Sequence, residues 1–153
     1  MPLTVRLATI GDAPVIARFN AAMALETEHL TLEEARLLAG VTRVLTDSSR
    51  GFYLVAESGG GVVGQLMITY EWSDWRNADF WWIQSVYVAP EARREGVFTA
   101  LYDEAERMAR ASGACGLRLY VEQDNARAQR TYAAKGMTPT AYRMYEVDFV
   151  IER

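Results

Sequence analysis

The feature that most constrains the fold is a strand, a loop and a helix in immediate succession, followed by another strand. Residues 80–88 (FWWIQSVYV) are rich in aromatic and β-branched residues, which is typical of a strand, and Pro90 ends it. A helix is predicted from Gly96, with Gly113 as its C-cap. Residues 116–122 (GLRLYVE) predict the next strand. Because strand–helix–strand crossovers are right-handed, we expect these two strands to be parallel partners.

The remaining elements follow from the hydrophobic periodicity on either side of this unit. Strands are predicted at 3–8, 52–57, 62–72 and 142–150, and helices at 12–26, from Thr31 onward and at 124–136. The second helix has Thr31 and Glu34 in the spacing of a capping box, and Ser58–Gly61 predicts a hairpin turn. No repeat or linker interrupts the chain, so we expect one α/β domain over residues 1–153 with a mixed sheet.

Charge and composition exclude several classes of protein. The net charge of −4 disfavours nucleic-acid binding, which needs concentrated positive charge. No apolar run reaches the roughly 18 residues of a membrane span, and the N-terminus lacks a secretory pattern. A single cysteine, Cys115, rules out an internal disulfide, and with only one histidine, His29, the composition argues against a zinc site. Carboxylates alone could still hold a metal ion, but no calcium-loop spacing is present. We therefore expect a cytoplasmic protein with no metal, no membrane partner and no nucleic-acid partner.

The loop between the first of these strands and its helix carries the chemistry of an anion site. Arg93, Arg94 and Gly96 precede the helix, and Thr99 lies in its first turn. The first backbone N–H groups of a helix have no internal partner and lie at the positive end of its dipole. Gly96 lets a diphosphate approach, while Thr99 and the arginines add donors and charge. The other interpretation is an ordinary turn with two solvated arginines.

A second pair of residues lies on the helix predicted at 124–136. Asn125 and Tyr132 are seven residues apart, which places them on one helical face. Taken singly, Asn125 is typical of a helix cap and Tyr132 of a half-buried core aromatic.

Together these segments resemble the GNAT acetyltransferase superfamily. That family has a V-x-V strand end, then an R/Q-x-x-G-x-G/A loop, then a helix with the pattern N-x-x-A-x-x-x-Y-x-x-x-G-[FM]. The matching residues here are Val86-Tyr87-Val88, Arg93–Phe98, Asn125, Ala128, Tyr132, Gly136 and Met137. The opening VRLATIGDAPVI also looks like the family's first strand and helix, so the resemblance covers nearly the whole chain.

The resemblance implies a mostly antiparallel mixed sheet flanked by helices, with a parallel strand pair forming the cleft for acetyl-CoA. The main chain of Val86 and Val88 would bind the pantetheine arm like an added strand. The loop through Gly96, Val97, Phe98 and Thr99, with Arg93 and Arg94, would hold the pyrophosphate. Asn125 would contact acetyl-CoA, and Tyr132 would protonate the leaving thiolate. Phe98 departs from the family's small residue, which leaves the loop geometry open.

The implied activity is direct transfer of an acetyl group from acetyl-CoA to an amine within a ternary complex. Four carboxylates are candidates for binding the amine or removing its proton: Glu26, Glu28, Glu71 and Asp74. Glu71 is favoured as base or amine anchor because a strand end positions a side chain firmly. Tryptophans flank the same region: Trp72, Trp75, Trp81 and Trp82. The tryptophans are suited to an apolar wall or to cation–π contacts, or belong to the core.

Several alternatives stay open at this point. A non-catalytic acyl-CoA sensor on the same fold would share the motifs, and a nucleotide-binding protein would use the loop alone. The acceptor is a small molecule or a peptide amine. The acyl-chain range and the formation of a homodimer are also open.

Overall fold

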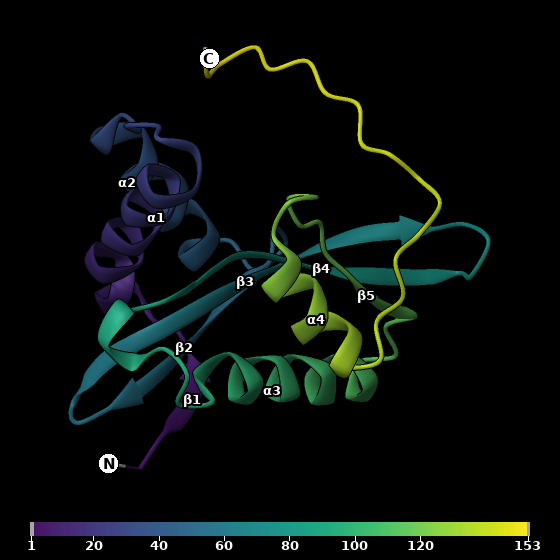
Figure 1. Ribbon diagram of the computed structural model, residues 1–153, viewed down its shortest axis with the longest axis horizontal. Helices are drawn as coiled ribbons and strands as arrows, with labels where there is room; N and C mark the ends of the chain where they lie inside the picture. The colour runs from purple at the N-terminus through teal and green to yellow at the C-terminus, as the bar shows by residue number, and fades with distance from the viewer. Residues whose placement is uncertain (1, 153) are drawn as a thin grey trace. The chain divides into compact units, whose positions relative to one another are not determined.

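A computed structural model describes residues 2–152. The chain divides into two compact units, Met1–Leu119 and Tyr120–Arg153. The first unit contains one five-stranded sheet in the order β1-β2-β3-β4-β5 (Figure 1). Its strands are β1 (Thr4–Leu7), β2 (Phe52–Ser58), β3 (Gly61–Ser73), β4 (Ala78–Val88) and β5 (Gly116–Arg118). Successive pairs are antiparallel except β4 and β5, which are parallel. The mixed sheet and the parallel pair confirm the predicted fold class.

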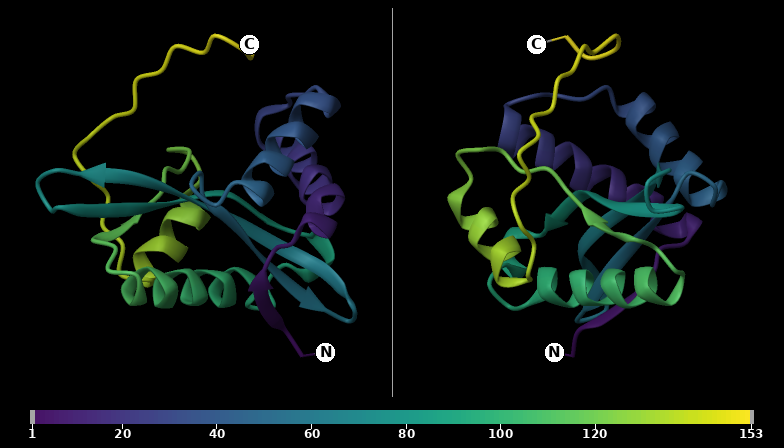
Figure 2. Two further views of the ribbon diagram at one scale, coloured as in Figure 1. Left: turned by 180° about the vertical axis from the view of Figure 1, so that it is seen from behind. Right: turned by 90° about the vertical axis from the view of Figure 1, so that its right-hand side faces the viewer.

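One face of the sheet is covered by α3 (Val97–Ala111). Residues of even number on β3 face this helix, because a Cβ added at Gly64 would meet the side chains of Val97 and Leu101. Leu66, on the same face of β3, and Leu101 are fully buried. The predicted crossover from β4 through α3 to β5 is therefore present. Figure 2 shows α3 lying along the sheet from two directions.

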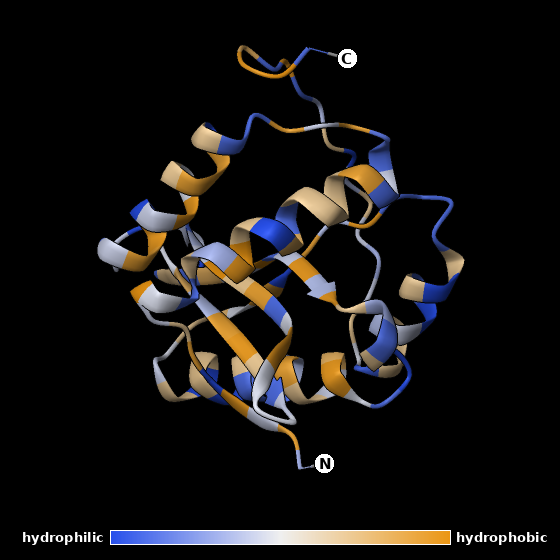
Figure 3. Cartoon of the chain, turned by 90° about the vertical axis from the view of Figure 1, so that its left-hand side faces the viewer, coloured by the Kyte–Doolittle hydropathy of each residue, from blue (hydrophilic) through white to orange (hydrophobic). Residues whose placement is uncertain are grey.

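The opposite face is covered by α1 (Ala13–Glu28), which follows the short 3₁₀ turn η1 (Ile10–Asp12). The next helix, α2 (Glu34–Thr46), packs against α1 and β2. A buried cluster joins these elements through Ile16, Val41 and Val55. Stripes of hydrophobic residues along these helices and strands alternate with hydrophilic ones (Figure 3).

Two boundaries differ from the sequence-based prediction by three residues or more. The helix expected to begin at Thr31 begins at Glu34, with Glu33 in an extended conformation as its N-cap. His29 ends α1 in the left-handed conformation, so the residues after it turn the chain back before a helix can restart. The strand expected over 116–122 is only three residues long, because β4 pairs with it only as far as Trp82.

The second unit contains one helix, α4 (Ala126–Ala134), as predicted for 124–136. The strand predicted over 142–150 is wrong: the structure has no strand there. Tyr145, Val147 and Phe149 are 92%, 73% and 90% exposed. The alternation of apolar and polar residues gives this segment one apolar face that could be buried in a sheet. A strand also needs a neighbouring strand to which its backbone can hydrogen-bond, and the segment has none among the described residues.

Candidate active site

The edge of β4 that faces β5 is unpaired over its second half. The parallel ladder joins Phe80, Trp81 and Trp82 to Gly116, Leu117 and Arg118, and goes no further. From Ile83 to Val88 the strand is paired on its β3 side alone. The main chain of Val86 and Val88 therefore borders an open sheet edge, which can accept an extended ligand as an added strand.

A β-bulge shapes this edge. Gln65 pairs with Tyr87 but Met67 pairs with Gln84, so β4 has one extra residue opposite Leu66. Ser85 adopts a left-handed φ of 50° at this point. Bulges of this kind bend a strand and occur often beside active sites.

The bulge is held from the α1 side by a buried amide. Gln65 is fully buried, and its Nε2 donates to the carbonyl oxygen of Ser85 at 3.1 Å and to Oδ1 of Asn20 on α1 at 2.9 Å. Its Oε1 has no hydrogen-bond partner among the described residues. Asn20 in turn donates to the Tyr53 hydroxyl at 3.4 Å, and burial raises the pKa of Tyr53. This network fixes the backbone at the bend of β4.

The loop after β4 ends at the N-terminus of α3, whose first amides make no hydrogen bond within the helix. Gly96 is the N-cap of α3 with φ of 81°, and Arg94 also has a positive φ of 68°. Ala100 N is the first amide to bond back, to the Gly96 carbonyl at 3.0 Å. The amides before it have no partner within the helix, so the loop presents the donors that an anion needs. Left-handed residues in such loops form anion-binding concavities.

Arg93 turns back onto the protein. Its Nε donates to the Val88 carbonyl at 2.9 Å, and its Nη2 donates to Glu26 at 2.9 Å. The other oxygen of Glu26 accepts from the Tyr87 hydroxyl. The Tyr87 bond, followed by the Arg93 bond, lowers the pKa of Glu26, while burial and Glu26 raise that of Tyr87. Arg93 therefore ties the loop to α1, whereas Arg94 is exposed and has no ion pair within residues 2–152.

Phe98, the residue that departs from the family pattern, is half-buried. Its ring lies 5.9 Å from that of Tyr102, one turn further along α3. The large side chain therefore lies along the helix beside Tyr102, and the backbone amide of Phe98 keeps its place in the first turn of α3.

The two predicted residues of α4 lie in the second unit. Asn125 is the N-cap of α4, and its Oδ1 accepts from Ala128 N at 3.1 Å. Tyr132 is half-buried two turns further on, and burial raises the pKa of its hydroxyl. A neutral phenol is the form that can give up a proton.

The comparison with known families now bears on this geometry. Residues 20–137 match the model of the acetyltransferase (GNAT) family. The chain belongs to that family. Members of this family are acetyltransferases that use acetyl-CoA as their cosubstrate.

Individual relatives agree with this assignment to the GNAT family. A crystal structure described as a possible acetyltransferase from Clostridium difficile 630 is 41% identical, with a TM-score of 0.89 over 99% of this chain and all of that one. An integron cassette protein from the Cole Harbour Salt Marsh metagenome, 19% identical with a TM-score of 0.85 over 97% of this chain and 91% of that one, shares the fold.

A curated mycothiol acetyltransferase of Beutenbergia cavernae is 36% identical over 112 residues, or 73% of this chain. The match spans about a third, 35%, of that relative's length.

The four carboxylates expected on the acceptor side of this GNAT protein differ in their contacts and in their exposure. Glu71, on the α1 face of β3, accepts from Trp82 Nε1 at 2.6 Å and from Arg118 at 3.1 Å. These contacts, the indole first, lower its pKa. Glu26 is held by the loop instead. Glu28 and Asp74 are exposed, at the end of α1 and in the β3–β4 turn.

The single histidine, the single cysteine and two of the tryptophans lie apart from Glu71 or on the other face of the sheet. The exposed His29 caps the C-terminus of α1. Cys115 is half-buried just before β5, with its sulfur 3.7 Å from the Ala78 carbonyl. Trp72 and Trp81 face α3, so they share no face with Trp82.

Sequence reasoning missed Tyr87, Gln65 and Arg118 as parts of the site. Tyr87 lies inside the V-x-V motif, where alternation points it away from its neighbours. Arg118 is a charged residue in an otherwise mostly apolar predicted strand, and this contrast could have marked it as a candidate site residue. Nothing in the sequence marks Gln65 or the bulge.

Two kinds of feature are absent from the described residues. No grouping of three or more His, Cys, Asp or Glu side chains has the geometry to hold a metal ion within residues 2–152. Among the same residues, no helix combines the length and apolar character of a bilayer-spanning segment.

Proposed function

We propose that this GNAT protein transfers an acetyl group from acetyl-CoA directly to the nitrogen of an amine. The observation that carries the proposal is the unpaired β4 edge that leads through Arg93–Gly96 into the N-terminus of α3. An open strand edge suits the amides of a pantetheine arm, and a helix N-terminus suits a diphosphate. Acetyl-CoA carries both groups in one molecule.

The residues predicted to bind acetyl-CoA take distinct parts in this proposal. The main chain of Val86 and Val88 binds the pantetheine arm. The amides of Val97, Phe98 and Thr99 receive the pyrophosphate, with Arg94 adding charge. Arg93, fixed by Glu26 and by the Val88 carbonyl, sets the course of the loop. Asn125 supports the same ligand from α4.

The chemical step begins with the neutral form of the amine, because only that form has a free lone pair on nitrogen. Its nitrogen lone pair forms a bond to the thioester carbonyl carbon, and the carbon–sulfur bond breaks. The nitrogen loses a proton to water or a carboxylate, and Tyr132 gives its hydroxyl proton to the leaving thiolate. Catalysis comes mainly from holding the two reactants together.

Glu71 is the proposed anchor of the amine. Its lowered pKa keeps it ionised near neutral pH, which makes it a weak base but a good partner for an ammonium group. Trp82 lies against the same carboxylate and offers an aromatic wall. Glu28, exposed at the end of α1, adds to the acidic surface for a cationic acceptor, whereas Glu26 is already paired with Arg93.

The test of the proposed function is turnover with a panel of amines. Polyamines, amino acids, aminoglycosides and peptide N-termini are incubated with acetyl-CoA, and free thiol is measured. Amine-dependent thiol release together with an acetylated product by mass spectrometry supports the proposal. Binding of acetyl-CoA with no turnover across the panel would favour the sensor alternative.

A further prediction concerns Glu71 and pH. Glu71→Gln should raise the KM for a cationic amine roughly tenfold, the effect of losing one charged contact. Because the carboxylate titrates below its usual range, the pH–rate profile between pH 6 and 9 should keep the shape of wild type. Asp74→Asn is the matched control. A loss of kcat that deepens toward low pH would instead make Glu71 the base.

A further inference from the structure

A pocket lies on the α3 face of the first unit, at the end of the sheet remote from the proposed acetyl-CoA loop. It is formed by the ends of β3 and β4 nearest their connecting turn and by the residues that follow α3, and it encloses about 430 Å³. The turn-side end of β4 begins at Ala78, whereas the loop follows Val88 at the other end. The 15 residues of α3 separate pocket and loop by about 22 Å.

Aromatic rings form one wall of the pocket. Tyr70 pairs directly with Trp81, and Trp72 pairs with Asp79, so all four side chains share the α3 face of the hairpin. The rings of Tyr70 and Trp81 are 5.7 Å apart in an edge-to-face arrangement. Trp72 remains 60% exposed, although indole is among the groups most stabilised by being covered.

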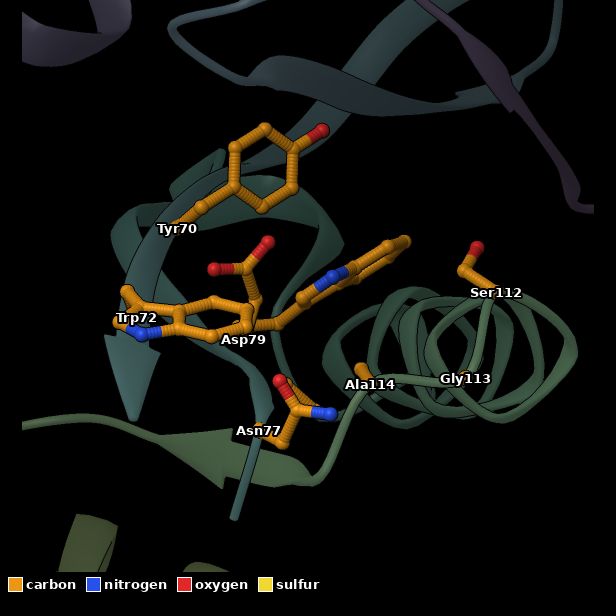
Figure 4. Close-up of a pocket in the computed structure, with 9 residues that line it drawn as sticks. Tyr70, Trp72, Asn77, Asp79, Ser112, Gly113 and Ala114 are labelled. Atoms are coloured by element: carbon orange, nitrogen blue, oxygen red, sulfur yellow. The ribbon is translucent and has the colours of Figure 1, made fainter. Parts of the chain in front are cut away.

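The charge of the pocket is negative. The half-buried carboxylate of Asp79 projects between the rings of Tyr70 and Trp72 (Figure 4). It has no hydrogen bond or ion pair to another side chain within residues 2–152. Asp79, after burial, also raises the pKa of Tyr70. The residues ending α3, Ser112 to Ala114, line the opposite wall with the negative end of the helix dipole.

The cationic side chains nearest this hairpin are directed to its other face. Arg76 and Arg118 lie over the ring of Phe80, at 4.8 and 3.6 Å from its centroid. Phe80 pairs with Glu71, on the α1 face. Within residues 2–152, no lysine or arginine lines the pocket. The last turn of α3 carries Arg110, which is paired with Glu106 and is not among the residues that line the pocket. Three aromatic rings, a carboxylate and a helix C-terminus are the elements of a site for an organic cation.

We propose that this pocket binds an alkylammonium cation, with the charged nitrogen between Tyr70, Trp72 and Asp79, independently of acetyl transfer. The aromatic rings take the alkyl groups, and the carboxylate and α3 dipole take the charge. Because the pocket is remote from the loop at the start of α3, cation and acetyl-CoA bind together.

The test uses choline as the probe and 3,3-dimethylbutan-1-ol as its uncharged isostere. The protein is labelled with nitrogen-15, and the four indole N–H signals are assigned by single Trp→Phe variants. Choline at millimolar concentrations should shift the signals of Trp72 and Trp81 and leave those of Trp75 and Trp82 in place. The neutral isostere should bind at least about tenfold more weakly.

Matched variants give the test its controls. Asp79→Asn should weaken choline binding about 5- to 30-fold, whereas Asp74→Asn, on the same turn but outside the pocket, should not. Trp72→Leu, at an exposed position, repeats the test if Asp79→Asn fails to fold. Saturating coenzyme A should leave the choline affinity unchanged.

Three outcomes would overturn the proposal. Equal binding of choline and its isostere would make the pocket merely apolar. Displacement of choline by coenzyme A would place the cation at the transfer site. Indole shifts that depend on protein concentration, with a dimer by sedimentation, would assign this face to a second copy of the chain.

Discussion

At the scale of single residues, chemical type alone did not decide between ligand binding and structural support. Arg93 and Arg94 are adjacent and chemically identical, yet Arg93 bonds to Glu26 and the Val88 carbonyl while Arg94 is exposed. Tyr87 received no role from the sequence, yet its hydroxyl bonds to the same Glu26 carboxylate. For Arg93 and Tyr87, the structural role is set by Glu26, a residue far away in the sequence.

Tyr132 is the residue whose replacement best separates an enzyme from a sensor. Tyr132→Phe keeps the ring, so the free energy of unfolding and the affinity for acetyl-CoA should barely change. An alkyl thiolate leaves without an acid, though more slowly, so kcat should fall roughly ten- to a thousandfold. Single-turnover kinetics would measure this on the chemical step.

The control for Tyr132 is Tyr142→Phe, which removes a hydroxyl at an 80% exposed position. It should turn over like wild type. An unchanged chemical rate in Tyr132→Phe would show that Tyr132 serves packing and that water protonates the thiolate.

At the scale of elements, α3 connects the two proposed sites, which have opposite polarity. Its N-terminus follows the loop proposed for the pyrophosphate, and its C-terminus borders the pocket proposed for a cation. A helix dipole favours negative charge at the first end and positive charge at the second. The left-handed Gly96 allows the loop to enter the helix without a side chain in the way.

Gly96→Val is expected to weaken acetyl-CoA binding by at least about tenfold. No atom lies within 4 Å of the added Cβ, so no internal clash arises. A β-branched residue instead resists φ of 81° and covers the amides that follow. Calorimetric titration with acetyl-CoA measures the loss.

The control is Gly60→Val, in the β2–β3 turn. Gly60 has φ of 82° and an equally open Cβ position, so the strain is similar but lies away from the loop. Both variants should lose comparable stability, and only Gly96→Val should lose affinity. Equal affinities in the two folded variants would contradict the assignment of the loop to the pyrophosphate.

At the scale of the whole molecule, one ionic network joins the first strand of the chain to the helical layer. Arg6 on β1 donates to both carboxylate oxygens of Asp12 at 2.8 and 2.9 Å and to Glu57 on β2 at 2.6 Å. Thr9 N also donates to Asp12 at 2.7 Å. The Arg6 bonds hold the pKa of Asp12 below its usual value.

Asp12→Asn should therefore lower the free energy of unfolding at pH 7 by about 1–3 kcal/mol, the range for a charged hydrogen bond that is lost. A depressed pKa contributes stability above the unfolded value near 4 and loses it as pH falls through the lower folded value. The difference from wild type should thus shrink below pH 4. Urea unfolding from pH 7 to pH 3 measures it.

The exposed pair of Arg36 and Glu33 supplies the comparison, since Glu33→Gln should cost well under 1 kcal/mol. A difference between Asp12→Asn and wild type that stays constant down to pH 3 would show that the effect of Asp12 is steric and not ionic.

The sequence by itself determined the order of helices and strands from β1 to α4, the crossover from β4 to β5, and the loop with Gly96 at the start of α3. These features follow from local preferences, such as hydrophobic period, proline and glycine positions and short motifs, which act over a few neighbouring residues. Asn125 also emerged as a helix cap for this reason, since its partner is three residues away.

Only the tertiary structure decided the rest, because those features depend on residues far apart in the chain. The bulge at Ser85 is held by Gln65 and Asn20. The position of the Arg93 side chain depends on Glu26, 67 residues away. The segment 142–150 has the alternation of a strand, yet an isolated extended segment leaves its backbone groups without partners. Local pattern proposes an element, and a neighbour from elsewhere in the fold must supply the hydrogen bonds that complete it.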